Sequence, residues 1–315
     1  MACKVVITGA AGNLGGLLAE NILDREVELR LLIHKKQPGP ALAARRNVRI
    51  FPIDLADKTT LTDALQGADV IVHFAGVLFK ANPEKFLPVT NTLYFKNLLE
   101  VALEAGVKRL ILISFPHVEG ETTPQHPATG KIDGHPASIH AQTRLEEEKL
   151  LFACGNRLEA VSLRVGMVYG RGILMIDAAR WFSRYRLLGI WRKPTWIHLI
   201  AAPDFVSAVK QAIFKADING IYHIGDDGVE TLQQFLDDAT HHWGTGRPWR
   251  MPLFMIYAAA YTCERFSWLT GCRSPLTRDF ITIGRMSYYG DTSRMKADLL
   301  PRLQYPTYRH GIHIL

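Results

Sequence analysis

Short apolar runs alternate with amphipathic segments along the first half of the chain. Six runs of strand length are rich in β-branched and aliphatic residues, and they lie at residues 4–8, 29–33, 48–53, 69–74, 109–114 and 160–165. The longer segments between them repeat apolar residues at helical spacing, at about 12–24, 83–105 and 138–154. Nearly continuous apolar strands that alternate with helices predict a doubly wound α/β fold, with a parallel sheet covered on both faces.

Composition and charge narrow the class of protein. Hydrophobic residues make up 48% and charged residues 21% of 315 residues, and the net charge of +7 is spread over short basic pairs. We therefore expect a globular protein that does not bind nucleic acid. The four cysteines lie far apart without a CxxC pair, which predicts no disulfide framework and no metal site. A reducing cytoplasm fits this cysteine usage.

Two further features bear on location. The chain enters its first strand at Lys4 without a basic and then apolar leader, so we expect no signal peptide. The longest apolar stretch, residues 253–269, is interrupted by Glu264 and Arg265. It is too short and too charged for a membrane span, and we expect a soluble cytoplasmic protein.

A glycine-rich turn follows the first strand and opens the first helix. It reads Thr8-Gly9-Ala10-Ala11-Gly12-Asn13-Leu14-Gly15. Gly9 allows a tight turn, Gly12 lets the backbone approach a pyrophosphate, and Gly15 permits close helix–strand packing. The N–H groups and the dipole at a helix start favour an anion. This turn predicts a dinucleotide site made by Gly9, Ala11, Gly12, Asn13, Leu14 and Gly15.

The end of the second strand bears on the choice between NAD and NADP. NAD-specific sites place an acidic residue there, to hold the ribose 2′-hydroxyl. This chain has His34, Lys35 and Lys36 instead. A lysine ammonium group attracts a 2′-phosphate that a carboxylate would repel, so the sequence predicts NADP(H), with NAD(H) as the alternative.

The pattern changes after residue 170. Residues 171–195 carry tryptophans and arginines, 221–224 predict a strand that returns to the sheet, and helices and aromatic loops follow. We expect a dinucleotide-binding domain at residues 1–170, to which 196–228 return. Residues 171–195 and 229–315 would form a smaller, mostly helical lid over the substrate.

Several motifs together resemble the extended short-chain dehydrogenase/reductase family, which includes NAD(P)-dependent epimerases and dehydratases. Thr8 to Gly15 is similar to its TGxxGxxG, and 73–76 to its H-x-A-[AG]. Residues 164–170 resemble its R-P-x-x-V-Y-G, and Asp204 the aspartate of its V-x-D-x-A segment. The resemblance implies a Rossmann-type fold. It also implies further cofactor contacts from Asp54, Leu55, Phe74, Ala75, Gly76, Asn91, Val165 and Val168.

The catalytic residues of that family are replaced in this chain. The family uses Tyr-x-x-x-Lys on the helix after the fifth strand, with a Ser or Thr at the end of that strand. The resemblance puts His140 at the tyrosine position, Arg144 at the lysine position and Phe115 at the serine position. Ser114 comes one residue earlier, and His117 lies in the following loop. Both stay candidates for catalysis beside His140 and Arg144, although the side chain of Ser114 should point elsewhere because strand side chains alternate.

Three kinds of function remain open. An atypical oxidoreductase would use His140 for proton transfer and Arg144 on the nicotinamide ribose; the arginine favours a neutral imidazole, which is a better base than acid. A non-redox isomerase, lyase or cyclase would keep the cofactor without net oxidation. A catalytically silent NADP(H)-binding or regulatory protein would tolerate all three replacements.

The substrate side is less defined. Aromatic residues are frequent between Trp181 and Trp268 in the expected lid, where they fit either a small, largely apolar substrate or the lid's own core. Arg180, Arg184, Arg186 and Arg192 recur near helical spacing and fit either a diphosphate or a solvated face. A homodimer is left open.

Overall fold

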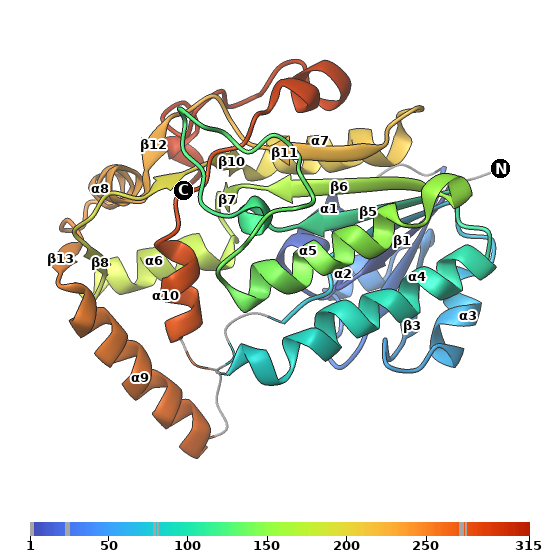
Figure 1. The fold of residues 1–315 in the computed structure, drawn as a ribbon, viewed down its shortest axis with the longest axis horizontal. Helices are drawn as coiled ribbons and strands as arrows, with labels where there is room; N and C mark the ends of the chain where they lie inside the picture. The colour runs from blue at the N-terminus through green and yellow to red at the C-terminus, as the bar shows by residue number, and fades with distance from the viewer. Residues whose placement is uncertain (1–2, 23–25, 78–79, 81, 271–273, 275) are drawn as a thin grey trace.

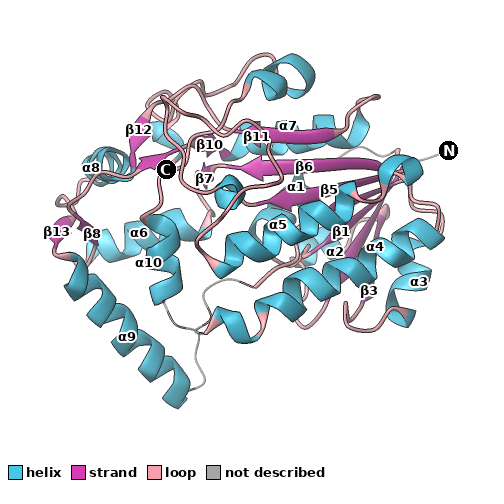
Figure 2. Ribbon diagram, viewed as in Figure 1, coloured by secondary structure: helices cyan, strands magenta, loops and turns pink. Residues whose placement is uncertain are grey.

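A seven-stranded parallel sheet forms the centre of the molecule (Figures 1 and 2). The computed structural model describes residues 3–22, 26–77, 80, 82–270, 274 and 276–315. Within them the strand order is β11-β6-β5-β4-β1-β2-β3. These strands are β1 (Cys3–Thr8), β2 (Val27–Ile33), β3 (Val48–Pro52), β4 (Val70–His73), β5 (Arg109–Ser114), β6 (Glu159–Val165) and β11 (Gly220–Ile224). The doubly wound α/β class is thus confirmed, and the direction of strand succession reverses between β1 and β4.

Helices cover both faces of this sheet (Figure 1). One face carries α3 (Thr59–Leu65), α4 (Tyr94–Glu104) and α5 (Ile139–Phe152). The other carries α1 (Asn13–Asn21), α2 (Pro40–Ala43) and α7 (Ala202–Phe214). In an open sheet of this kind, ligands bind beyond the carboxyl ends of the strands at the point of reversal. That rule directs attention to the ends of β1 and β4.

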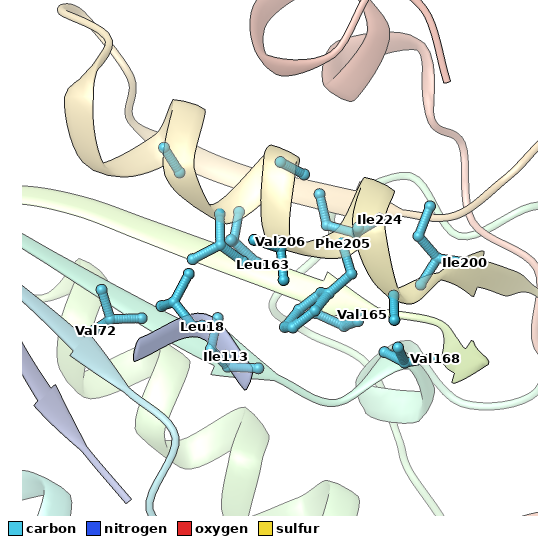
Figure 3. Close-up of a cluster of buried hydrophobic side chains, with 14 of the residues drawn as sticks. Leu18, Val72, Ile113, Leu163, Val165, Val168, Ile200, Phe205, Val206 and Ile224 are labelled. Carbon is cyan, nitrogen blue, oxygen red and sulfur yellow. The ribbon is translucent and has the colours of Figure 1, made fainter. Parts of the chain in front are cut away.

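Alternating strand residues divide the core into two layers. On β1, Val5 and Ile7 face the layer that includes α1 and α7, whereas Val6 faces the layer of α3, α4 and α5. Figure 3 shows part of the first layer, where Leu18 and Phe205 meet the strands. These side chains are fully buried, as expected of strands that are covered on both sides.

The helix predicted at residues 83–105 is divided. A 3₁₀ turn, η1 (Pro83–Lys85), precedes a π-helical stretch, η2 (Pro88–Leu93), and only α4 is regular α-helix. Pro83 and Pro88 begin the first two pieces. Proline has no N–H to donate to the preceding turn, so a continuous ladder through these positions cannot form.

The second half adds short elements around the carboxyl edge of the sheet. They include β7 (Met167–Tyr169), β8 (Gly189–Trp191), β9 (Trp196–Ile197), β10 (Leu199–Ala201), β12 (Glu230–Thr231) and β13 (Trp249–Met251). The helices are α6 (Leu174–Arg184), α8 (Leu232–His242), α9 (Leu253–Thr270) and α10 (Arg278–Gly284). Short helical turns are η3 (Pro116–Glu119), η4 (Gly155–Arg157), η5 (Met295–Leu299) and η6 (Ile312–Ile314). None of the helices described is both long and apolar enough to span a bilayer.

Candidate functional site

The turn between β1 and α1 has a geometry that needs glycine. Gly9 has φ +68°, and a Cβ there would lie 3.0 Å from the Ala75 N atom. The Gly12 N–H donates to the Gly9 carbonyl O at 2.8 Å. A Cβ on Gly15 would come within 2.5 Å of that same oxygen. The three glycines therefore hold the turn tight against the end of β4.

The start of α1 is open to a ligand. Gly12 precedes the helix, no side chain caps it, and Gly12 and Asn13 are exposed. The side chain of Asn13 is engaged elsewhere, since its amide donates to the Gly172 carbonyl O at 2.5 Å and its Oδ1 accepts from the Leu174 N–H at 3.0 Å. The first backbone N–H groups of a helix have no intrahelical acceptor. They and the helix dipole make the start of α1 favourable for an anion.

The ends of β2 and β3 lie next to this turn. His34, Lys35 and Lys36 follow β2 and are exposed, with His34 Nδ1 3.3 Å from the Ile53 carbonyl O. Asp54 and Leu55 follow β3 and are half-buried. Because β2 is the neighbour of β1 in the sheet, the two lysines lie at the edge where the adenosine ribose of a dinucleotide would lie.

The residues after β4 form the other wall of the site. Phe74 and Ala75 are half-buried and Gly76 is exposed. The Ala75 N–H donates to Thr8 Oγ1 at 3.3 Å, which ties this segment to the end of β1. Val165 and Val168, by contrast, point into the hydrophobic core (Figure 3). A ligand contact from those two positions would have to use the backbone.

Helix α5 carries His140 and Arg144 one turn apart on the same face. Ser138 caps the helix, with its Oγ accepting from the Ala141 N–H at 3.2 Å. The His140 imidazole is 4% exposed and meets the Phe115 ring edge-on, with ring centres 4.7 Å apart. Burial, the Arg144 charge and the nearby His117 lower the pKa of His140 to about 3. The imidazole is therefore neutral at pH 7.

The Arg144 guanidinium lies at the carboxyl end of β4. Its Nη2 donates to the Ala75 carbonyl O at 3.0 Å, and its Nη1 donates to Glu147 Oε2 at 2.6 Å. A Cβ on Gly76 would come within 2.2 Å of Nη2, so a side chain there would displace the end of the arginine. Asn91 is close by. Its amide donates to Thr143 Oγ1 at 3.1 Å, while its buried Oδ1 has no partner among the described residues.

Ser114 and His117 take different places. Ser114 Oγ donates to Glu148 Oε1 at 2.5 Å, away from His140, in line with strand alternation. His117 Nε2 donates to the Met286 carbonyl O at 3.0 Å, and its ring centre lies 5.0 Å from that of Phe115. Burial lowers the pKa of His117 to about 4. The structure thus groups His117, Phe115, His140 and Arg144, and leaves Ser114 outside that group.

A comparison with family models decides the relationship. The model of the NAD dependent epimerase/dehydratase family matches residues 5–225, which include the glycine turn, the β4 end and α5. The chain belongs to this family. Its members are the NAD-dependent epimerases and dehydratases of the extended short-chain dehydrogenase/reductase group, so the predicted resemblance is confirmed. The chain is accordingly an epimerase/oxidoreductase-like enzyme with a nicotinamide dinucleotide site.

Individual proteins are similar to this chain over most of its length. A uronate dehydrogenase from Pseudomonas syringae pv. tomato is 30% identical over 228 residues, 71% of this chain and 75% of the relative. The structure of MoeE5 with UDP-glucose and NAD has a TM-score of 0.73 at 20% identity, covering 99% of this chain and 96% of that one. Human epimerase family protein SDR39U1 (isoform 2) with NADPH gives 0.78 at 15% identity, covering 99% and 98%. At such identities the structural matches concern the fold alone.

This family member also has acidic residues beneath the site that the sequence analysis did not single out. Glu147 is fully buried, its Oε1 has no partner among the described residues, and burial raises its pKa to about 7. Glu148, the next residue, accepts hydrogen bonds from Arg164 Nε at 3.0 Å and from Arg164 Nη2 at 2.6 Å. The three-residue spacing of Arg144 and Glu147 on one helix was the signal available for the first pair. The partner of Glu148 lies on β6, and spacing along the chain does not indicate it.

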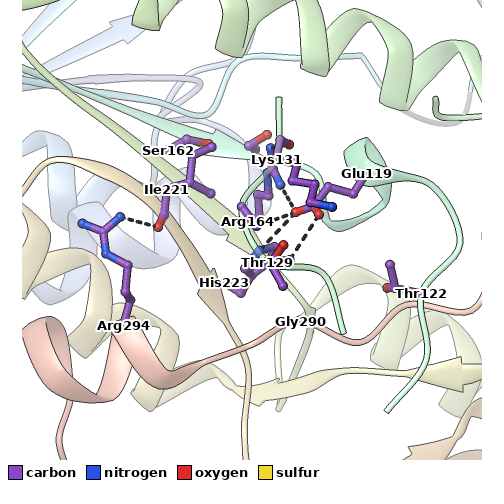
Figure 4. A network of polar contacts seen from close by, with 12 residues as sticks. Glu119, Thr122, Thr129, Lys131, Ser162, Arg164, Ile221, His223, Gly290 and Arg294 are labelled. Atoms are coloured by element: carbon purple, nitrogen blue, oxygen red, sulfur yellow. Dashed lines mark hydrogen bonds and ion pairs between the residues drawn. The ribbon is translucent and has the colours of Figure 1, made fainter. Parts of the chain in front are cut away.

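A buried ionic network joins Arg164 to the loop after β5 (Figure 4). Arg164 also donates to Glu119 and, at 2.7 Å, to the Lys131 carbonyl O. Burial by itself would raise the pKa of Glu119, but contacts from His223, the Gly130 and Thr129 N–H groups and Arg164 lower it to about 2. This network fixes the loop that carries His117. Among the described residues, no group of three or more His, Cys, Asp or Glu side chains is placed to hold a metal ion.

Proposed function

We propose that this enzyme binds NADP(H) and oxidises an alcohol group of a small, largely apolar substrate, with His140 as the proton acceptor. The observation that carries the proposal is the neutral, buried imidazole of His140, one helical turn from a cation that lies at the end of β4. A neutral imidazole can take up a hydroxyl proton on its unprotonated nitrogen, whereas only an imidazolium is a good proton donor near neutral pH. The arrangement therefore favours oxidation over carbonyl reduction.

The residues of this chain fit a nicotinamide dinucleotide at several points. The turn at Gly9, Gly12 and Gly15 leaves no room for side chains, and the uncapped start of α1 suits a pyrophosphate. The buried Oδ1 of Asn91 lacks a partner beside Gly76 and can accept a hydrogen bond from the ligand. These features support a cofactor that extends from the glycine turn toward Arg144.

The proposed chemistry divides between the cofactor and the chain. The oxidised cofactor, when bound, would supply a hydride acceptor for the substrate carbon. His140 accepts the proton of the substrate hydroxyl, and the ring of Phe115 packs against the imidazole and limits water there. Arg144 is held by Glu147 and by the Ala75 carbonyl, so it supplies a fixed positive charge near the ribose. With a pKa near 3 the imidazole is a weak base, and we expect slow turnover.

The cofactor preference can be tested at the end of β2. Replacing both Lys35 and Lys36 by serine removes the positive charge that would face a 2′-phosphate, so the preference for NADPH over NADH should fall by about tenfold, or ~1.4 kcal/mol. Fluorescence titration with the two cofactors measures the ratio. Arg46→Ser, at an exposed position before β3, serves as the control. An unchanged ratio, or tighter binding of NADH by the parent protein, would refute the NADP(H) assignment.

His140→Ala tests the catalytic proposal. With NADP⁺ and a panel of small apolar alcohols, kcat should fall by about 10²–10⁴-fold while NADPH affinity stays the same. His126→Ala, in an exposed loop position, is the matched control. Because the imidazole is neutral, the parent rate should show no titration of this group between about pH 5 and 8. Equal turnover in both variants would exclude His140 as the proton acceptor.

A sugar acid is the second candidate substrate, because the similar protein from Pseudomonas syringae is a uronate dehydrogenase. The same assay should therefore include glucuronate. NADPH formation with glucuronate but with no apolar alcohol would overturn the apolar assignment and keep the oxidoreductase. Product without any change at the nicotinamide absorbance band would instead indicate the non-redox alternative.

A further inference from the structure

Exposed aromatic side chains gather at one end of the molecule. This end is formed by α6, β8, β13 and α9 (Figure 1), and we call it the aromatic–basic end. Its most exposed rings are 54–72% accessible, and they belong to Trp181, Tyr185, Trp249, Phe254, Phe266 and Trp268. Such large rings are usually buried in a monomer, so their grouping marks a surface that something covers.

Helix α6 contributes an apolar stripe that faces outward. Its inner side is closed by Ile176 and Ser183, which are buried. Leu174, Trp181 and Tyr185 recur at helical spacing on the outer side and are 54–56% exposed, with the Trp181 and Tyr185 rings 4.8 Å apart. Arg180 and Arg184 lie beside this stripe and are exposed as well. The apolar side of the helix is therefore open to solvent, with cations along its border.

Helix α9 is apolar around most of its circumference and yet protrudes from the body (Figure 1). It packs through Ile256 and Ala260 against α10, while Phe266, Trp268 and Leu269 near its end are 63–72% exposed. A helix that is hydrophobic on all sides is normally buried. Trp249, just before this helix, donates its indole N–H to the Arg186 carbonyl O at 3.0 Å and so connects α9 to the end of α6.

The charge of the chain is concentrated at this same end. Residues 171–195 contain six basic residues and one acidic residue, and residues 243–270 contain three arginines and one glutamate. Since the whole chain has a net charge of +7, the remainder is neutral overall. The glutamate, Glu264, is buried and paired with Arg278 at 2.8 Å. Arg250 is paired as well, with Asp237 of α8 at 2.7 Å. The other basic residues of these two segments still give the exposed surface an excess of positive charge beside its aromatic rings.

We propose that the aromatic–basic end docks this enzyme on the surface of an anionic phospholipid membrane. Tryptophan and tyrosine partition to the boundary between headgroups and acyl chains, and arginine binds lipid phosphates. A second copy of the chain fits less well. A two-fold contact would bring the same patch, with the same positive charge, against itself. An anionic bilayer offers both the apolar volume and the opposite charge. The proposal is independent of the cofactor and of His140.

Flotation of the full chain with lipid vesicles tests this docking. The protein should float with vesicles of phosphatidylcholine and phosphatidylserine, and remain unbound with phosphatidylcholine alone. Replacing both aromatic residues by serine, in Phe266→Ser/Trp268→Ser, should lower the bound fraction at limiting lipid about tenfold. Reversing two charges in Arg180→Glu/Arg184→Glu should lower it by about 25-fold or more, because each cation near such a surface is worth about fivefold in partitioning. High salt should weaken binding further.

Matched controls separate docking from unfolding. Phe214→Ser replaces an aromatic residue that is 45% exposed on α7, and Arg302→Glu reverses an exposed charge near the C-terminus. Both should float like the parent, and all variants should keep NADPH affinity and thermal stability. Equal flotation by the control and test variants would overturn the proposal, as would equal binding to neutral vesicles. Absence of flotation would also overturn it, and a self-association that Phe266→Ser/Trp268→Ser abolishes would then assign the surface to a second copy.

Discussion

Gly12→Val should weaken dinucleotide binding strongly. The Gly12 backbone, at φ −82°, is one that valine can adopt, so the backbone conformation itself does not forbid the change. A Cβ there, however, would lie 2.9 Å from the Gly9 carbonyl O, and the remaining methyl groups would stand over the exposed start of α1. They would occupy the space that a pyrophosphate needs in order to reach the helix N–H groups.

The expected size of this effect is large. Loss of close approach to the pyrophosphate should raise the Kd for NADPH about 100-fold, which corresponds to ~3 kcal/mol. Isothermal titration calorimetry measures it directly. Gly246→Val is the control, because a Cβ at Gly246 meets nothing within 4 Å among the described residues. If Gly12→Val bound NADPH as well as Gly246→Val does, the cofactor would have to bind elsewhere.

The α/β architecture could be predicted because it depends on local patterns. Strand β5, Arg109–Ser114, has the bounds that its apolar run predicts. The glycine turn was likewise evident, since each of its glycines answers a local steric demand. The break at Pro88 was missed because apolar spacing at residues 83–105 remains helical across it. The π-helical stretch there depends on neighbouring elements such as α5, which it contacts.

Only part of the candidate site could be predicted from the sequence. The family register could place His140 and Arg144 together on α5, and side-chain alternation could turn Ser114 away. The burial that depresses the pKa of His140 comes from Phe115 and the loop around His117, which are distant in the chain. Exposure of the lid aromatics was equally hidden. Apolar residues at helical spacing indicate that a face will be covered, but not whether the protein itself covers it.

Arg164→Met should be among the most destabilising single changes in this protein. Arg164 is fully buried and lies between Glu148 and Glu119, whose side chains are also buried or nearly so. Removing the cation leaves two carboxylates in a region of low polarity. Breaking a buried ion pair from one side costs about 3–5 kcal/mol. Urea unfolding, followed by circular dichroism, should show that loss in the free energy of unfolding. Arg309→Met is the matched control, because Arg309 is 57% exposed in its pair with Glu230 and should cost less than about 1 kcal/mol.

Lowering the pH should reduce the difference in the free energy of unfolding between Arg164→Met and the parent. In the parent, the pKa of Glu119 is depressed to about 2. The stability that its ionised form contributes is complete above its unfolded pKa, near 4.5, and is lost as the pH falls toward 2. In Arg164→Met the same carboxylate is buried without its cation, so its pKa rises and protonation relieves the strain at a higher pH. The parent therefore loses this stability between about pH 5 and 2 while the variant loses less. Adding Glu148→Gln to Arg164→Met should likewise recover part of the loss at neutral pH, because it removes one uncompensated charge. A difference that stayed constant with pH, and that Glu148→Gln did not reduce, would mean that Arg164 stabilises the fold by packing rather than by its charge.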